Sequence, residues 1–159
     1  MLHFVFDLDD TLIIHRGQIN YEWIYPDRSL CSILSRCSER GLCHLYTNGT
    51  KSHADLLLQK MDLARFFKER VYPREFHGLK PSVSSFTKVG DKICAGDTCE
   101  DNHIIFFDDM IENLKTAKDF GWTTIWISRY HGSVGHYPYI NHAYGSVVDA
   151  LTKIHKMLL

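Results

Sequence analysis

Short apolar runs, separated by segments with helical spacing, constrain the fold of this chain most strongly. The runs cover residues 2–6, 42–47, 103–107 and 122–127, with a short fifth at 71–72. Apolar residues at intervals of three and four predict helices at 30–37, 54–61, 110–120 and 147–158. Strands that alternate with helices favour a mostly parallel sheet covered on both faces. The predicted class is α/β, a three-layer Rossmann-like domain.

Composition excludes several function classes. The 159 residues are 45% apolar, which fits one domain over 1–159, and the net charge of -1 provides no basic field for avid nucleic-acid binding. Five cysteines without a C-x-x-C pair do not suggest a disulfide scaffold. The sequence shows neither a signal peptide nor a run of 18 apolar residues, so we expect a cytoplasmic protein without membrane partners.

Carboxylates gather where the predicted strands end. Asp7 and Asp9 follow the first strand, and Asp108 and Asp109 follow the run at 103–107. The carboxyl ends of parallel strands meet at one edge of a sheet, where ligands bind. Clustered carboxylates raise one another's pKa unless a cation compensates them, and oxygen-rich sites suit Mg²⁺. A magnesium site is therefore expected at this edge.

Four ordered motifs resemble those of the haloacid dehalogenase (HAD) superfamily of phosphatases. They are DLDDTL (7–12), TNG (47–49), Lys80-Pro81, and IIFFDD (104–109) followed by ENL (112–114). The resemblance implies a Mg²⁺-dependent phosphatase that forms an aspartyl-phosphate. It also implies roles for individual residues.

By this resemblance, Asp7 is the nucleophile and a metal ligand. Asp9 is the general acid for the leaving oxygen and then the base for water, with its backbone carbonyl toward the metal. Asp109 binds Mg²⁺ directly, and Asp108 binds it directly or through water.

The same resemblance assigns the phosphate-binding residues. Thr47 hydrogen-bonds the phosphoryl group, helped by backbone N–H groups of the Asn48-Gly49 turn. Lys80 bridges the nucleophile and the phosphoryl oxygens.

Two competing patterns carry less weight. The segment KICAGDTCEDN (92–102) also looks like a strand that ends in Gly-Asp, but it runs directly into the next strand, so Asp97 is interpreted as a loop residue. Cys94, Cys99 and His103 match no standard zinc spacing and are interpreted as structural residues.

The intervals 13–46 and 50–81 leave no room for a cap domain, so the predicted site is open or closed by a neighbouring subunit. Two segments remain to shape it, an aromatic flap at 13–25 and a loop at 128–145. The predicted substrate contacts are Arg16, Trp23, Arg129 and His131.

Substrate and reaction class stay open at this point. The chain is similar to pyrimidine 5′-nucleotidases around its second motif, and to the magnesium-dependent phosphatase-1 group in length and layout. The substrate is expected to be a small phosphorylated metabolite, a nucleotide or a phosphoprotein. A catalytically idle binding module and a phosphotransferase are the alternatives, and the oligomeric state cannot be read from the sequence.

Overall fold

The computed structural model describes residues 1–76, 78–95 and 101–157. Within these ranges six strands form one all-parallel sheet in the order β3-β2-β1-β4-β5-β6. The strands are β1 (Leu2–Phe6), β2 (Leu42–Tyr46), β3 (Phe67–Val71), β4 (His103–Asp108), β5 (Thr123–Ile127) and β6 (His142–Tyr144). The predicted α/β, Rossmann-like fold is confirmed.

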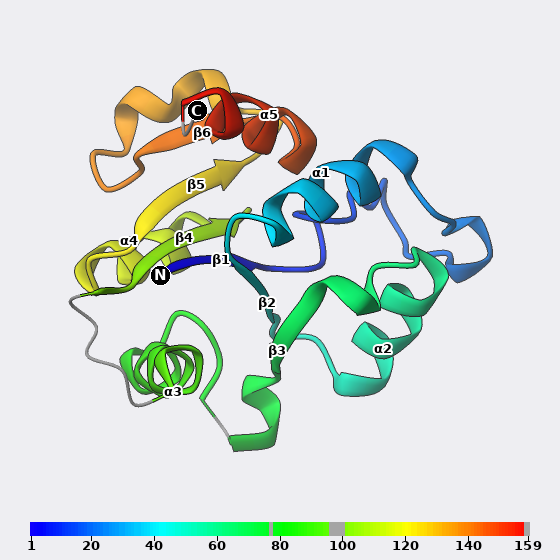
Figure 1. The fold of residues 1–159 in the computed structure, drawn as a ribbon, viewed down its shortest axis with the longest axis horizontal. Helices are drawn as coiled ribbons and strands as arrows, with labels where there is room; N and C mark the ends of the chain where they lie inside the picture. Colours follow the sequence, from blue (N-terminus) through cyan, green and yellow to red (C-terminus); the bar gives the residue numbers. More distant parts are fainter. Residues whose placement is uncertain (77, 96–100, 158–159) are drawn as a thin grey trace.

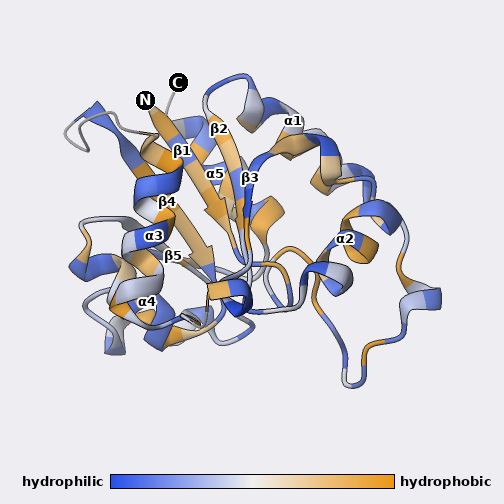
Figure 2. Cartoon of the chain, turned by 90° about the horizontal axis from the view of Figure 1, so that it is seen from below, coloured by the Kyte–Doolittle hydropathy of each residue, from blue (hydrophilic) through white to orange (hydrophobic). Residues whose placement is uncertain are grey.

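Helices cover both faces of the sheet and give three layers (Figure 1). One face carries α1 (Arg28–Ser38), α2 (Lys51–Lys60) and α5 (Val147–Met157), and the other carries α3 (Val83–Cys94) and α4 (Ile111–Asp119). Single 3-10 turns lie between them: η1 (Tyr21–Trp23), η2 (Ala64–Phe66), η3 (Pro73–Phe76) and η5 (His131–His136). The strands are mainly hydrophobic along their length, as burial on both faces requires (Figure 2).

The helices predicted from apolar spacing are all present, and side chains cap the first two. The carboxylate of Asp27 caps α1, because it accepts from the backbone N–H groups of Ser29 and Leu30. The helix α2 begins at Lys51, and the hydroxyl oxygen of Thr50 accepts from the backbone N–H of His53.

Two elements were not predicted, β6 and α3. The helix α3 buries Phe86, Val89 and Ile93, which have the spacing i, i+3, i+7, but serines and Gly90 weaken its helix propensity. The first residues of the segment 92–102 therefore belong to a helix and not to a strand, since α3 ends at Cys94. Asp97 and Cys99 lie outside the described residues.

Strand order places the site. The chain runs from β1 outward to β3, crosses over, and continues from β4 to β6, so β1 and β4 are neighbours at the point where the order reverses. Phe6 pairs with Phe107, and the backbone N–H of Asp7 donates to the carbonyl of Phe107 at 3.0 Å. The residues that follow β1 therefore lie beside the end of β4, in the crevice where α/β sheets bind ligands.

The two intervals in which a cap could be inserted hold only short elements in the described residues. Between β1 and β2 lie η1 and α1, and between β2 and Lys80 lie α2, η2, β3 and η3. The segment before α1 loops outward beside α1 and α2 (Figure 1). Among the helices that the structure describes, none is long and apolar enough to cross a membrane.

Candidate active site

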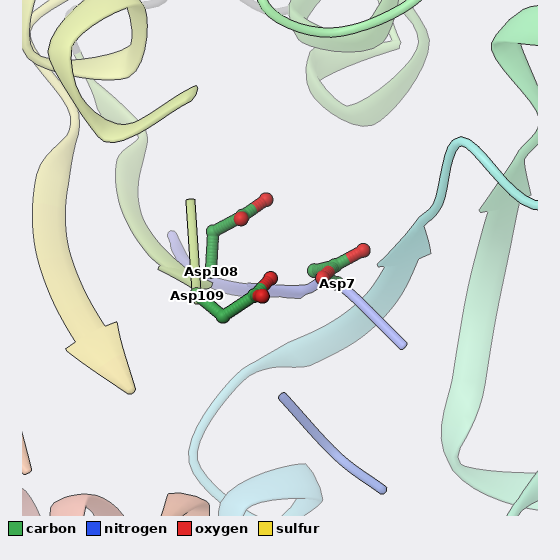
Figure 3. A group of neighbouring side chains, drawn as sticks. All are labelled: Asp7, Asp108 and Asp109. Carbon is green, nitrogen blue, oxygen red and sulfur yellow. The ribbon is translucent and has the colours of Figure 1, made fainter. Parts of the chain in front are cut away.

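Three carboxylates converge at the ends of β1 and β4. Asp7, Asp108 and Asp109 each offer an oxygen within 4.8 Å of the others, and in the described residues they form the one such group of potential metal ligands (Figure 3). Asp7 and Asp108 are buried, and Asp109 is partly exposed. Their side chains point toward one another, so the two halves of the sheet contribute to one site.

The ammonium group of Lys80 is the counter-charge of this cluster. Its Nζ donates to Asp7 Oδ1 at 3.0 Å, to Asp108 Oδ2 at 2.7 Å and to the carbonyl of Tyr46 at 2.9 Å. The side chain is 1% exposed, and Nζ lies 4.8 Å from the centre of the Tyr46 ring. Three acceptors and an aromatic face satisfy this buried cation.

Asn48 fixes the backbone that carries Lys80. Its side-chain amide donates to the Lys80 carbonyl at 3.1 Å, and its Oδ1 accepts from the Lys80 N–H at 2.9 Å. The peptide bond from Lys80 to Pro81 is cis. The side chain of Asn48 thus holds the loop of the lysine, while phosphate binding by the backbone N–H groups of the Asn48-Gly49 turn stays a prediction.

Asp108 has its acceptor positions filled by protein donors. Oδ1 accepts from the backbone N–H of Met110 at 2.8 Å, Oδ2 accepts from Lys80, and the amide of Asn113 donates to both oxygens at 3.2 and 3.1 Å. A carboxylate has about four lone-pair positions. Asp108 is therefore suited to orient Lys80, which leaves Asp7 and Asp109 as the carboxylates better placed to meet a cation directly.

Charge in the cluster is not balanced. Burial, and then the neighbouring Asp108 and Asp7 carboxylates, raise the pKa of Asp109 to about 8. Burial also raises the pKa of Asp7 to about 6, against the lowering effect of Lys80. Burial alone would lower the pKa of Lys80, but Asp108 and Asp7 raise it, so the lysine stays charged. When all three carboxylates are ionised, they exceed the one ammonium by two negative charges, and a hard divalent cation fits this donor set.

Two buried threonines, Thr11 and Thr47, follow β1 and β2. Thr11 donates to Asp7 Oδ2 at 3.0 Å. The hydroxyl oxygen of buried Thr47 accepts from the N–H of Gly49 at 3.1 Å. A Cβ on Gly49 would lie 3.3 Å from the Thr47 hydroxyl and 3.5 Å from Asp9 Oδ2, so glycine permits this close approach.

The carboxylate of Asp9 is turned toward two histidines. Its Oδ1 lies 2.7 Å from His15 Nε2 and 2.9 Å from His53 Nε2, and its Oδ2 lies 3.0 Å from His53 Nε2. The hydroxyl of Tyr21 lies 2.6 Å from His53 Nδ1. The Asp9 side chain is not one of the three clustered carboxylates, and contact of its backbone carbonyl with a metal stays a prediction.

The four predicted substrate contacts lie outside this cluster. Arg16 and Trp23 line a cavity of about 800 Å³ between the flap and α5, and Trp23 is 77% exposed. Arg129 bonds to the hydroxyl of Tyr130, and His131 contacts the carbonyl of Ser128 in its own loop. Contact of these residues with a substrate stays a prediction.

The sequence analysis did not single out the residues that hold the aspartates in place. Thr11 and Asn113 lie inside the recognised motifs, so their positions are a usable signal. His15 and Tyr21 lie on the flap, His53 lies on α2, 32 positions after Tyr21, and the ten histidines show no cluster in the sequence. Their convergence on Asp9 is visible only in three dimensions.

Comparisons with known proteins identify the fold. No family model and no curated protein matches the sequence. Among solved structures, the L-2-haloacid dehalogenase of Xanthobacter autotrophicus matches with a TM-score of 0.66 and 13% identity, over 86% of this chain and 64% of the dehalogenase. The chain thus spans less than two thirds of that enzyme.

Two further matches include a phosphatase and a magnesium complex. A HAD phosphatase from Thermococcus onnurineus has a TM-score of 0.63 and 20% identity, over 83% of this chain and 57% of its own. The HAD-hydrolase YfnB from Bacillus subtilis, solved bound to magnesium, has a TM-score of 0.63 and 18% identity, over 80% of this chain and 54% of its own. The chain therefore has the fold of the HAD superfamily.

Proposed function

We propose that this chain is a Mg²⁺-dependent phosphomonoester hydrolase that works through an aspartyl-phosphate on Asp7. The observation that carries the proposal is the buried bridge from Lys80 to Asp7 and Asp108, with Asp109 beside it and negative charge in excess. A nucleophilic carboxylate must approach a phosphate dianion, and at 4 Å each pair of like charges costs about 4 kcal/mol at an effective dielectric constant of about 20. The site therefore needs cations on both sides of the reacting oxygen.

The first step uses two aspartates. An oxygen of Asp7 attacks phosphorus, the bond from phosphorus to the ester oxygen breaks, and the departing oxygen takes a proton from Asp9. Lys80 holds the Asp7 carboxylate in place and offsets the charge of the phosphoryl oxygens. Thr47 lies at the end of β2 with its hydroxyl available to donate to the phosphoryl group, since that oxygen accepts from Gly49.

The second step restores the enzyme. Water attacks the phosphorus of the aspartyl-phosphate and gives a proton to Asp9, and the bond from phosphorus to Asp7 breaks to release inorganic phosphate. Mg²⁺, held by Asp7, Asp109 and the Asp9 carbonyl, with Asp108 behind them, would supply charge stabilisation of the phosphoryl oxygens.

Asp9 favours ester hydrolysis over dehalogenation. A halide leaves without a proton, whereas an alkoxide leaving group needs one. An acid two residues after the nucleophile is therefore useful for phosphate esters. Without a cap in the described residues, the open site fits a small metabolite, a nucleotide or a phosphoprotein as substrate.

Hydrolysis of p-nitrophenyl phosphate tests the proposal. We expect release of p-nitrophenol with Mg²⁺, loss of turnover in EDTA, and a decrease on the order of 10³-fold or more in kcat/KM for Asp7→Asn. The control is Asp10→Asn, because Asp10 is exposed in the same loop and its Oδ1, which accepts from the His15 N–H, is retained by asparagine. Equal activity of wild type and Asp7→Asn would contradict the proposal.

Two other functions make different predictions in the same assay. A catalytically idle binding module gives no turnover with any phosphate ester while still binding Mg²⁺ or phosphate. A phosphotransferase gives faster p-nitrophenol release when an alcohol acceptor is added. It then releases less inorganic phosphate than p-nitrophenol, because part of the phosphoryl group goes to the alcohol. The retained Asp7, Asp9 and Lys80 favour hydrolysis over the idle module.

A further inference from the structure

The carboxyl group of Asp9 is contacted by side chains that have no role in the reaction steps proposed above. Its side chain is 30% exposed, on the loop after β1, and the torsion that turns its carboxyl plane is intrinsically broad. One donor, His53 Nε2, contacts both oxygens, at 2.9 and 3.0 Å. Contacts to both oxygens hold the outer end of the carboxyl group against His53.

His53 is itself held on a rigid element. It lies in the first turn of α2, a helix that buries Ala54, Leu57 and Leu58 in the core. Its backbone N–H is capped by Thr50. The imidazole is 14% exposed and packs edge-on against the Tyr21 ring, with centroids 5.7 Å apart. The position of His53 is therefore set by the fold and not by the flap alone.

Tyr21 fixes the remaining freedom of the imidazole. Its hydroxyl lies 2.6 Å from His53 Nδ1. When the hydroxyl donates to Nδ1, Nε2 carries the hydrogen and donates to Asp9, so each polar atom of the ring has a partner. A group that orients an acid or base and is oriented by a third group is a common catalytic arrangement.

His15 makes a weaker claim to this role. Its Nε2 contacts only Oδ1, at 2.7 Å, and it belongs to the flap, where its backbone N–H donates to Asp10. Among the described residues, Asp9 Oδ2 accepts from His53 alone. Without His53, the carboxyl group of Asp9 is held by His15 at Oδ1 alone and can turn about that hydrogen bond.

We propose that His53, locked by Tyr21, is a positioning residue that orients the carboxyl group of Asp9 for proton transfer to the leaving oxygen. The proposal rests on the phosphatase function proposed above. In the first step the proton moves from Asp9 to the ester oxygen as the bond to phosphorus breaks. His53 then donates to the carboxylate that remains, and this carboxylate takes the next proton from water.

Dependence on the leaving group tests this role, because an activated phenolate needs little protonation and an alkoxide needs it fully. For His53→Ala we expect kcat/KM to fall by about 10- to 100-fold with an alkyl phosphate such as glycerol 2-phosphate, part of the usual value of general acid catalysis. With p-nitrophenyl phosphate the loss should stay below about 3-fold. A glutamine can place its Nε2 near that of histidine, so His53→Gln should recover most of the alkyl phosphate activity.

A double-mutant cycle isolates the path through Asp9. In an Asp9→Asn background, His53→Ala should cause no further loss, because the oriented acid is already absent. Tyr21→Phe removes one hydroxyl from the lock and should show a smaller loss with the same preference for the alkyl phosphate. This variant also carries the test if His53→Ala fails to fold, as judged by circular dichroism.

The matched control is Gln59→Ala, an exposed position on the same helix, which should leave both substrates unaffected. Equal losses with both substrates, or a full additional loss in the Asp9→Asn background, would overturn the positioning role while leaving the phosphatase intact. Wild type that hydrolyses neither substrate with Mg²⁺ would refute the phosphatase function instead.

Discussion

Replacing Lys80 by methionine removes the counter-charge from the buried cluster and keeps most of the side-chain volume. The ammonium lies 3.0 Å from Asp7 Oδ1 and 2.7 Å from Asp108 Oδ2. At an effective dielectric constant of about 20, each attraction is worth about 5 to 6 kcal/mol. The net cost is smaller, because the abandoned carboxylates can take up protons, and breaking a buried pair typically costs about 3 to 5 kcal/mol. We expect Lys80→Met to lower the free energy of unfolding by this amount in EDTA at pH 8.

The loss should depend on pH with a defined sign. Without the lysine, which lowers the pKa of Asp7, the folded-state pKa of Asp7 rises further above the unfolded value, so folding favours its protonated form. Such groups contribute full stability below the unfolded pKa of about 3.9 and lose it as pH rises through the folded pKa. Lys80→Met should therefore be destabilised less at pH 5 than at pH 8.

Urea denaturation in EDTA at both pH values measures this effect. Lys51→Met is the matched control, because Lys51 makes an exposed ion pair with Asp55 at 3.4 Å and its loss should cost no more than about 1 kcal/mol. Adding Asp108→Asn to Lys80→Met should recover part of the loss, since fewer buried charges remain unpaired. If Lys80→Met matched the wild type within about 0.5 kcal/mol at pH 8, the cluster would not be the buried, charged site described here.

Two further predictions concern the pH dependence of Mg²⁺ affinity and of the free energy of unfolding. Mg²⁺ must displace protons from Asp109, whose pKa is raised to about 8, and from Asp7, whose pKa is raised to about 6. Isothermal titration calorimetry should therefore show that the apparent Mg²⁺ affinity increases by up to about tenfold per pH unit toward pH 8. A pH-independent affinity would contradict the assigned ligands. Burial lowers the pKa of His44 from 6.5 to about 4, so its contribution to stability is present above pH 6.5 and is lost as pH falls toward 4, by about 2 kcal/mol between pH 7 and pH 5. His44→Leu should flatten this dependence in urea denaturation, and an unchanged slope would show that another group is responsible.

Prediction of the fold succeeded where burial controls the sequence pattern. Central strands of a parallel sheet are covered on both faces, so their residues are mainly apolar, and 103–107 and 122–127 are recognisable for that reason. The edge strand β6 has only three residues, one exposed and two partly buried, and α3 has weak helix formers held by tertiary packing. Neither carries a strong local signal, and both were missed.

The candidate site was likewise predictable only in part. Asp7, Lys80, Asp108 and Asp109 are brought together as their motifs suggested, while their catalytic roles stay a proposal. The partners of Asp9 come from the flap and from α2, whose sequences give no sign that they meet. The side chain of Asn48 binds the backbone of Lys80, a contact that the sequence did not predict, and phosphate binding by the backbone N–H groups of the Asn48-Gly49 turn stays a prediction.

The sequence by itself determined the alternation of strands and helices and the residue types at the strand ends, because local periodicity and chemical character are written in neighbouring positions. Only the tertiary structure decided which of these side chains interact electrostatically and which are held in place by hydrogen bonds to one another. Burial and neighbouring charges raise the pKa of Asp7 and Asp109, and packing joins His53 to Asp9 across 44 positions of the chain. Those quantities arise only when segments remote in sequence pack at one edge of the sheet.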